Sequence, residues 1–400
     1  MSESWRPLVR GAAADEARRA VLDIAEALAT TSEGDENPTL ADGDAGVALF
    51  FDYLGRVAGD DRLRARAGGL LDRALASTVE RALPLGLYTG VAGVGWALAH
   101  VDPSAELDEL DGLLLDRLDR SPWSGTHDLI EGLVGIGVYA LERSNDAFAD
   151  AALARIVARL DERAERSAAG GVTWKTPVEH LPAHHAATFA SGYYNLGLSH
   201  GVPGVVALLG RARRRRKLPP AGDRLLDGAV TWLLARPRDD ADAGRFPAAI
   251  VEPDGSGPSS RCAWCYGDPG VAAALWLAGR DEALTIARHA ASLACVDGEV
   301  LDAGLCHGAA GLLHIYLRLS QHGDETLAAA ARHWLRRTLD ARRPGTGLAG
   351  WLAFDGGRGR PAVWRPECGF LIGVAGIGLA LTAAISEVAP AWDRALLLSA

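Results

Sequence analysis

A short motif, Gly-x-x-Gly followed by an apolar run, occurs seven times along this chain of 400 residues. Successive copies lie 47, 42, 69, 66, 41 and 65 residues apart. The first glycines of the copies are Gly43, Gly90, Gly132, Gly201, Gly267, Gly308 and Gly373. Repetition on this scale is typical of an architecture that stacks one supersecondary unit many times.

Each apolar run is preceded by a charged stretch with helical periodicity. In residues 147–167, for example, Leu153, Ile156, Val157 and Leu160 fall on one helix face. The same pattern occurs in 14–30, 61–81, 105–119, 222–236, 281–296 and 325–340. An apolar run with no polar face must be enclosed by other helices. The sequence therefore predicts an all-α fold: an α/α toroid, or double barrel, of seven hairpins, each pairing an amphipathic outer helix with an apolar inner helix.

The predicted toroid is a single domain over residues 1–400, with minor β-rich insertions in its long loops. β-propensity is concentrated in Val172–Val178 and Phe246–Val251. The gap at 168–199 is longer than a simple hairpin connection requires. We therefore expect a small β-rich extension there.

Composition limits the functional classes. The formal charge is 41 − 51 = −10, which argues against nucleic acid as a partner. The basic run Arg211–Lys217 is interpreted as the exposed end of a helix. The N-terminus has no export signal, and Cys368–Ser386, although uncharged over 19 residues, contains four glycines and is interpreted as a buried inner helix. We expect a cytoplasmic protein with reduced cysteines and no integral membrane span.

The repeat register predicts which side chains gather at one end of the inner helices. One residue before the first glycine stand Asp42, Thr89, Glu131, His200, Tyr266, His307 and Ile372. Two residues before it stand Ala41, Tyr88, Ile130, Ser199, Cys265, Cys306 and Leu371. Roughly parallel inner helices present all these positions at one mouth, where helix N-termini carry partial positive charge. Cys265 and Cys306 are thus equivalent positions of adjacent repeats, and we expect them close together.

Two thiolates and one imidazole form a zinc-binding set with one coordination position open, as in catalytic zinc sites. We therefore predict Cys265, Cys306 and His307 as zinc ligands. Two alternatives stay open: Cys262 could complete a structural zinc site as fourth ligand, or could form a redox C-x-x-C pair with Cys265. Cys295 and Cys368 are expected to be small buried hydrophobic residues.

Four phrases resemble the lanthionine synthetase C-like (LanC) family: HDLIEGLVGIG (127–137), NLGLSHGVPG (195–204), WCYGDPG (264–270) and CHGAAG (306–311). With the repeats, the likeness covers essentially the whole chain. It implies a stand-alone, Zn²⁺-dependent cyclase that adds peptide cysteines to dehydroalanine or dehydrobutyrine and so closes thioether (methyl)lanthionine rings. It also implies a dehydrated precursor peptide of leader and core as substrate, a partner dehydratase, and compatibility with a membrane-bound biosynthetic complex.

The resemblance also assigns residues. The family's zinc ligands match the three predicted above, and its catalytic histidine and acidic partner fall on His200 and Asp128. An active-site arginine and tyrosine fall on Arg261 and Tyr266. We expect His200 to protonate the α-carbon of the enolate that thiol addition creates, with Asp128 orienting its imidazole. Alternatively, Asp128 caps a helix, Arg261 forms a structural ion pair, and Tyr266 only lines the pocket.

Three other functions remain open at this stage. A LanC-like enzyme could add glutathione or another thiol to dehydrated residues. A prenyltransferase-like toroid would also activate a thiol with zinc, and would require an aspartate such as Asp268 as ligand. A non-catalytic peptide-binding scaffold would use zinc only for stability. Consumption of a peptide thiol would distinguish the cyclase from the non-catalytic scaffold, which would consume no thiol.

Overall fold

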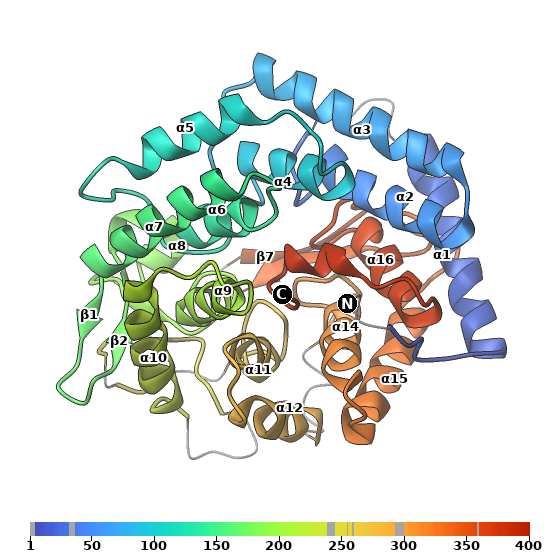
Figure 1. Cartoon of the computed structure of the whole chain (residues 1–400). Coiled ribbons are helices and arrows are strands. Elements are labelled where there is room, and N and C mark those ends of the chain that lie inside the picture. Colours follow the sequence, from blue (N-terminus) through green and yellow to red (C-terminus); the bar gives the residue numbers. More distant parts are fainter. Residues whose placement is uncertain are drawn as a thin grey trace. The chain divides into compact units, whose positions relative to one another are not determined.

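The structure is a computed structural model that describes residues 5–31, 37–237, 245–253, 255–257, 260–292, 300–357 and 360–400. Cys295 lies outside these ranges. The chain divides into two units: unit 1 is Met1–Leu83 with Asp297–Trp392, and unit 2 is Pro84–Val296 with Asp393–Ala400. Their helices and strands are labelled in Figure 1, where colour follows residue number. We describe each unit by itself. The expectation of a single domain over 1–400 stays a prediction.

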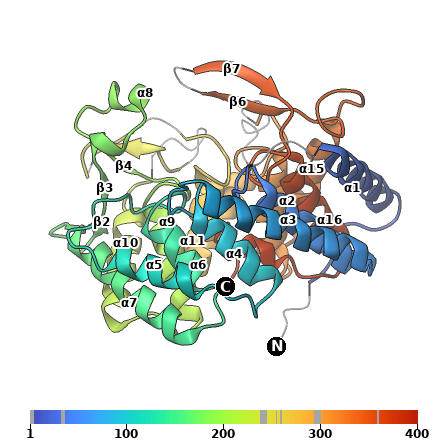
Figure 2. The ribbon, with the colours of Figure 1, turned by 90° about the horizontal axis from the view of Figure 1, so that it is seen from above.

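The part of unit 1 that the structure describes has three apolar inner helices and three amphipathic outer ones. The inner helices are α2 (Asp44–Ala58), α14 (Ala309–Ser320) and α16 (Val374–Ile385). The outer helices are α1 (Ala12–Thr31), α3 (Asp61–Glu80) and α15 (Glu325–Asp340). Helix α16 packs against both other inner helices, while α3 covers α2 and α15 covers α14. Strands β6 (Ala353–Gly357) and β7 (Arg360–Arg365) form an antiparallel hairpin that stands out from these helices (Figure 2).

Unit 2 repeats the same plan with four hairpins. Its inner helices are α4 (Val91–Val101), α6 (Leu133–Ala140), α9 (Val202–Arg214) and α11 (Asp268–Leu277). Each packs against the next in that order. Its outer helices are α5 (Asp108–Leu118), α7 (Asp146–Glu162), α10 (Pro220–Leu234) and α12 (Glu282–Ser292).

Unit 2 also contains two small antiparallel sheets. One pairs β1 (Glu165–Arg166) with β2 (Val172–Thr173). The other places β4 (Tyr193–Asn195) between β3 (Lys175–Thr176) and β5 (Ala249–Ile250). A 3₁₀ turn, η1 (Val178–His180), and a one-turn helix, α8 (Ala183–Ala186), lie between β3 and β4. That residues 168–199 act as a separate extension stays a prediction.

The helical predictions are confirmed with small corrections. All seven apolar runs form inner helices, each beginning directly after the first glycine of its motif. The apolar run after Cys368 becomes α16, which is buried over nearly its whole length. The helix expected over 147–167 ends at Glu162, because residues 165–166 pair with β2 instead. No described helix is both long and apolar enough to cross a membrane.

The basic run at the end of α9 is exposed in part. Arg214, Arg215 and Arg216 are exposed, as expected, whereas Arg211 is fully buried. Arg214 donates through Nε to the carbonyl oxygen of Leu277 at 2.8 Å, and Arg213 donates to that of Ala278. These carbonyls lie at the C-terminal end of α11, where a helix leaves oxygen atoms without intrahelical donors. The run therefore caps a neighbouring inner helix.

The second glycine of each motif allows the loop to pass close to the helix. A Cβ atom at Gly311 would lie 2.0 Å from the carbonyl oxygen of Leu305, and one at Gly376 would lie 2.0 Å from that of Phe370. In both cases the obstructing atom belongs to the backbone six residues earlier. Any larger residue must therefore displace the loop that carries the candidate site.

Gly311→Ala is expected to destabilise the protein by several kcal/mol, at least about 3 kcal/mol, because neither the helix nor the loop can yield cheaply. Urea unfolding measures the change. Gly69→Ala is the matched control, since Gly69 also lies in a helix but has no atom within 4 Å of the added carbon. The control should be neutral or stabilising by up to about 1 kcal/mol. Equal stabilities of the two variants would contradict the packing argument.

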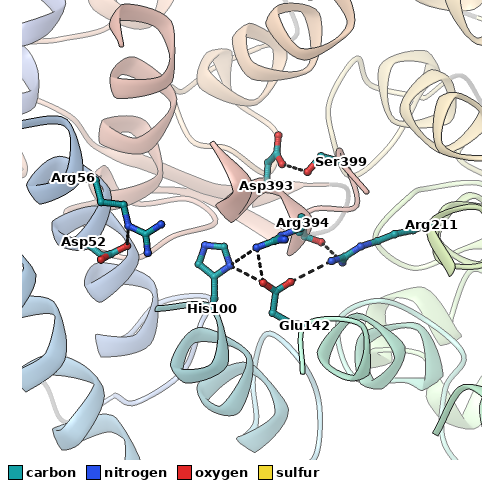
Figure 3. A network of polar contacts seen from close by, with 8 residues as sticks. All are labelled: Asp52, Arg56, His100, Glu142, Arg211, Asp393, Arg394 and Ser399. Atoms are coloured by element: carbon teal, nitrogen blue, oxygen red, sulfur yellow. Dashed lines mark hydrogen bonds and ion pairs between the residues drawn. The ribbon is translucent and has the colours of Figure 1, made fainter. Parts of the chain in front are cut away.

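The C-terminal tail is held by buried polar contacts within unit 2 (Figure 3). Glu142, 4% exposed in its side chain, lies 2.9 Å from Nδ1 of His100, 2.6 Å from Arg394 and 3.1 Å from Arg211. Burial alone would raise the pKa of Glu142, but the hydrogen bond and charge of His100 and the two arginines lower it to about 2. Glu142 therefore stays ionised and anchors Arg394, the last residue of the 3₁₀ turn η3 (Ala391–Arg394).

Candidate functional site

In unit 2, backbone hydrogen bonds join the loops that precede neighbouring inner helices. The N–H of Tyr88 donates to the carbonyl oxygen of Ile130 at 3.1 Å, and that of Leu129 donates to Ser199 at 3.0 Å. The N–H of Ser199 in turn donates to Cys265 at 3.4 Å. Positions two or three residues before the first glycine therefore follow one another along the row of loops. Within unit 2, the repeat register correctly predicted which positions lie side by side.

Unit 1 shows the same arrangement. The N–H of Cys306 donates to the carbonyl oxygen of Leu371 at 2.8 Å, and that of Leu371 donates to Ala41 at 3.0 Å. Cys306 is half-buried, whereas Cys265 of unit 2 is 5% exposed. In each unit, a backbone hydrogen bond to the neighbouring loop therefore fixes the cysteine in its loop before the inner helix.

His307 is oriented by residues outside its own helix. Its Nε2 lies 3.2 Å from the carbonyl oxygen of Phe354, at the start of the β6–β7 hairpin, and 3.6 Å from Asp302. The buried carboxylate of Asp302 also accepts the N–H of Phe354 at 2.9 Å. An imidazole that donates from Nε2 leaves Nδ1 with its lone pair available to a metal. Such outer hydrogen bonds fix the tautomer and ring orientation of metal-binding histidines.

His200 and Asp128 form a close pair in unit 2. Nδ1 of His200 lies 2.7 Å from Oδ2 of Asp128, with 43% of the His200 side chain exposed and 11% of the Asp128 side chain. The other oxygen, Oδ1, accepts from the hydroxyl of Thr126 at 3.1 Å and from the N–H of Glu131 at 2.9 Å. Asp128 therefore both closes the turn before α6 and holds the histidine. Asp128 does not cap that helix, whose N-cap residue is Gly132.

The pair stabilises its own charged form. Burial by itself lowers the pKa of His200, but the hydrogen bond and charge of Asp128 outweigh it and raise that pKa above its usual 6.5. Burial likewise raises the pKa of Asp128, yet its bond to His200 brings the pKa below the usual 3.8. At a pH between the pKa of Asp128 and that of His200, the charged imidazolium of His200 faces the charged carboxylate of Asp128. His200 can then hold a proton near neutral pH and release it to a reacting group.

The His200–Asp128 pair gives the stability a defined pH dependence. Its contribution is fully present below about 6.5, the unfolded pKa of histidine, and is lost as the pH rises through the higher folded pKa. It is also lost at low pH, as the pH falls through the lowered pKa of Asp128. In Asp128→Asn the pKa of His200, measured by NMR titration, should fall. An unchanged pKa would contradict the assignment.

Tyr266 lies beside this pair. Its ring centroid is 6.5 Å from that of His200, and its hydroxyl oxygen accepts from Nδ2 of Asn195 at 3.0 Å. Burial, followed by the neighbouring Tyr193, raises the pKa of Tyr266 well above its ordinary value. The phenol therefore keeps its proton at any working pH.

The remaining candidates are less constrained. Arg261 is exposed, and the described residues include no hydrogen bond or ion pair from it to Asp128. Cys262 is half-buried in the same tight loop. Glu131, also exposed, accepts from the hydroxyl of Thr89 at 3.3 Å. Asp268, the metal ligand that a prenyltransferase-like site would need, accepts the N–H groups of residues 245 and 246 at 3.1 Å and so has a structural role.

Two residues near the site were not singled out from the sequence: Asn195, which bonds to Tyr266, and Asp302, which lies against His307. Both stand six residues before the first glycine of their motif, at the start of the loop. A polar residue at the same position of both loops was the available signal. Its meaning depends on side-chain directions, which the repeat register does not give.

Comparisons with known proteins were made for the sequence and for the fold. Residues 34–397 match the family model described as "Lanthionine synthetase C-like protein". A sequence search of curated proteins gave no match. Among solved structures, one titled "Nisin cyclase" aligns with a TM-score of 0.75 at 20% identity, covering 95% of this chain and 97% of that one. The predicted all-α, α/α-toroid fold class is thereby confirmed.

A second solved structure is titled as a possible member of the GH105 family from Salmonella enterica subsp. enterica serovar Paratyphi A. It aligns with a TM-score of 0.42 at 13% identity, over 95% of this chain and 97% of that one. A score this low carries no argument about the present chain.

Proposed function

Because the chain belongs to the lanthionine synthetase C-like family, we propose that it is a zinc-dependent lanthipeptide cyclase. It adds cysteine thiols of a peptide to dehydroalanine or dehydrobutyrine residues of the same peptide and forms thioether rings. The similar fold titled as a nisin cyclase supports a cyclase of this type. The substrate is a dehydrated precursor of leader and core, supplied by a partner dehydratase.

The observation that carries the proposal is the repeat register of the cysteines. Cys265 and Cys306 hold the same position in adjacent repeats, and neighbouring loops within each unit are bonded at that position. We therefore propose that both cysteines and His307 hold one zinc ion. Two thiols with an imidazole already oriented through Nε2 fit the donor set of a catalytic zinc site. When bound, zinc lowers the pKa of the substrate thiol, which is otherwise about 8.5.

His200 supplies the acid–base chemistry. Addition of the thiol sulfur to the β-carbon leaves an enolate at the amide carbonyl, and the α-carbon must then gain a proton. The raised pKa of His200 allows it to carry that proton, and Asp128 holds the imidazole at 2.7 Å in one orientation. Arg261 stands in the same loop as Cys265, where its positive charge would stabilise the enolate oxygen.

The cellular setting follows from the same proposal. A cyclase that acts on a newly made precursor works in the cytoplasm, alone or with a membrane-bound biosynthetic complex. Within one toroid domain over 1–400, residues 168–199 are the candidate extension for the leader peptide. That segment joins the site directly, because β4 ends at Asn195, which is bonded to Tyr266.

Incubation of the zinc-loaded protein with a dehydrated, cysteine-containing peptide tests the proposal. Addition within the peptide does not change its mass, so ring closure is followed as loss of thiol that can be alkylated. A gain of mass with glutathione would instead support a LanC-like enzyme that uses external thiols. If no thiol is consumed with any dehydrated peptide, the zinc-stabilised scaffold is the better description.

A further inference from the structure

We propose that Asn195 is a positioning residue that directs the phenolic hydrogen of Tyr266 toward the substrate carbonyl oxygen, where enolate charge develops. The inference rests on the proposed cyclase function. It adds to that function a neutral hydrogen-bond donor for the enolate oxygen, beside the positive charge of Arg261, and the residue that orients this donor.

The orientation of the Asn195 amide is fixed by its surroundings. The side chain is buried, and its Oδ1 accepts the N–H of Gly197 at 2.7 Å. A backbone N–H can only donate, so the oxygen of the amide must face Gly197 and the nitrogen must face the other way. That nitrogen lies 3.0 Å from the hydroxyl oxygen of Tyr266 and 3.3 Å from that of Tyr193. Flipping the amide would lose the bond from Gly197 and set the NH₂ group against that N–H, two donors face to face.

This orientation determines where the phenolic hydrogens go. An amide NH₂ group has two hydrogens to donate and accepts none, so both phenols must receive a hydrogen bond from Asn195. Neither can give its own hydrogen back to that nitrogen. Within the described residues, the bond from Asn195 is the hydrogen bond of the Tyr266 hydroxyl. The hydrogen of Tyr266 therefore remains available for an acceptor on a bound substrate.

The position of Tyr266 suits an enolate oxygen. Tyr266 directly follows Cys265, the proposed metal ligand, and its ring lies 6.5 Å from that of His200. A donor fixed in advance toward developing negative charge stabilises the transition state more than the ground state. His200 then remains the group that protonates the α-carbon.

Asn195→Asp tests the inference with almost no change in shape. One carboxylate oxygen can still accept from Gly197, but the other is now an acceptor, so both phenols must turn their hydrogens toward it. We expect the rate constant of thiol consumption, kcat, to fall about 10²–10³-fold, as for loss of one oxyanion donor, with KM and zinc content nearly unchanged. Tyr266→Phe should cause a similar loss, and Tyr193→Phe, the matched control, about tenfold or less.

The double variant distinguishes positioning from general damage. If Asn195 acts through Tyr266, adding Asn195→Asp to Tyr266→Phe should cost nothing further. Additive losses, or a fully active Asn195→Asp, would overturn the inference. If Asn195→Asp does not fold, Asn195→Ala is used instead, which removes the hydrogen bonds that Asn195 donates to Tyr193 and Tyr266. Its double variant with Tyr266→Phe should again lose no more activity than Tyr266→Phe alone.

A second measurement needs no peptide. The Raman difference spectrum between the wild type and Tyr266→Phe should show a phenol that accepts a hydrogen bond. The difference spectrum between Asn195→Asp and the double variant with Tyr266→Phe should show a Tyr266 phenol that donates a strong hydrogen bond. Unchanged spectra would refute the orientation even if cyclisation proceeds, whereas a wild type that consumes no thiol would refute the cyclase proposal alone.

Discussion

Cys306→Ala is expected to abolish both zinc binding and ring closure. Removal of one thiolate from a site with three protein ligands leaves a cysteine and a histidine, too few to retain the ion in a catalytic geometry. Metal content measured after dialysis should fall from about one zinc ion per chain to near zero, and thiol consumption should fall with it. Cys306→Ser should behave in the same way, since a hydroxyl is a poor zinc ligand at neutral pH.

The control for this variant is Cys262→Ala. Cys262 is also half-buried and lies three residues before Cys265, but it has no equivalent in the repeat register. It should retain zinc and ring closure. If Cys262→Ala loses the metal while Cys306→Ala keeps it, the ion is held by the C-x-x-C pair and the proposed site is wrong. Circular dichroism of both variants excludes unfolding as the cause.

The fold could be predicted because one local pattern recurs. The first glycine of each motif is followed at once by an inner helix, and the first helical N–H often donates seven residues back, as from Ala309 to Asp302 and from Val374 to Glu367. Where loops close in this way, aligning the glycines also aligns the loop residues of one unit. This explains why the register placed positions such as Ser199 and Cys265 side by side.

The sequence was less informative where structure depends on partners distant in the chain. The β6–β7 hairpin was not predicted, since its strands are short and include glycine, proline and charged residues. Yet its first strand supplies the carbonyl group that orients His307. The burial of Arg211 was also missed, because its partner Glu142 stands 69 residues earlier. Residue type alone gave no sign of either contact.

His200→Ala is expected to retain zinc and to lose ring closure. The His200 side chain is hydrogen-bonded to Asp128, and 43% of it is exposed to solvent. It is also not one of the proposed zinc ligands. Its removal should therefore leave the fold and the metal in place. General acid–base catalysis typically contributes about 10²–10⁴-fold, and the rate constant of thiol consumption should fall by that factor. His322→Ala, at an exposed histidine after α14, is the control and should be fully active.

The pH dependence of kcat in the wild type and the variants distinguishes proton transfer by His200 from a purely steric role of its side chain. In the wild type, kcat should depend on a group whose pKa lies above the ordinary histidine value of 6.5, because Asp128 raises the pKa of His200. In His200→Ala that dependence should disappear, and in Asp128→Asn it should move to lower pH. A His200→Ala protein that closes rings at the wild-type rate would show that the proton comes from another group and would refute the role proposed for His200.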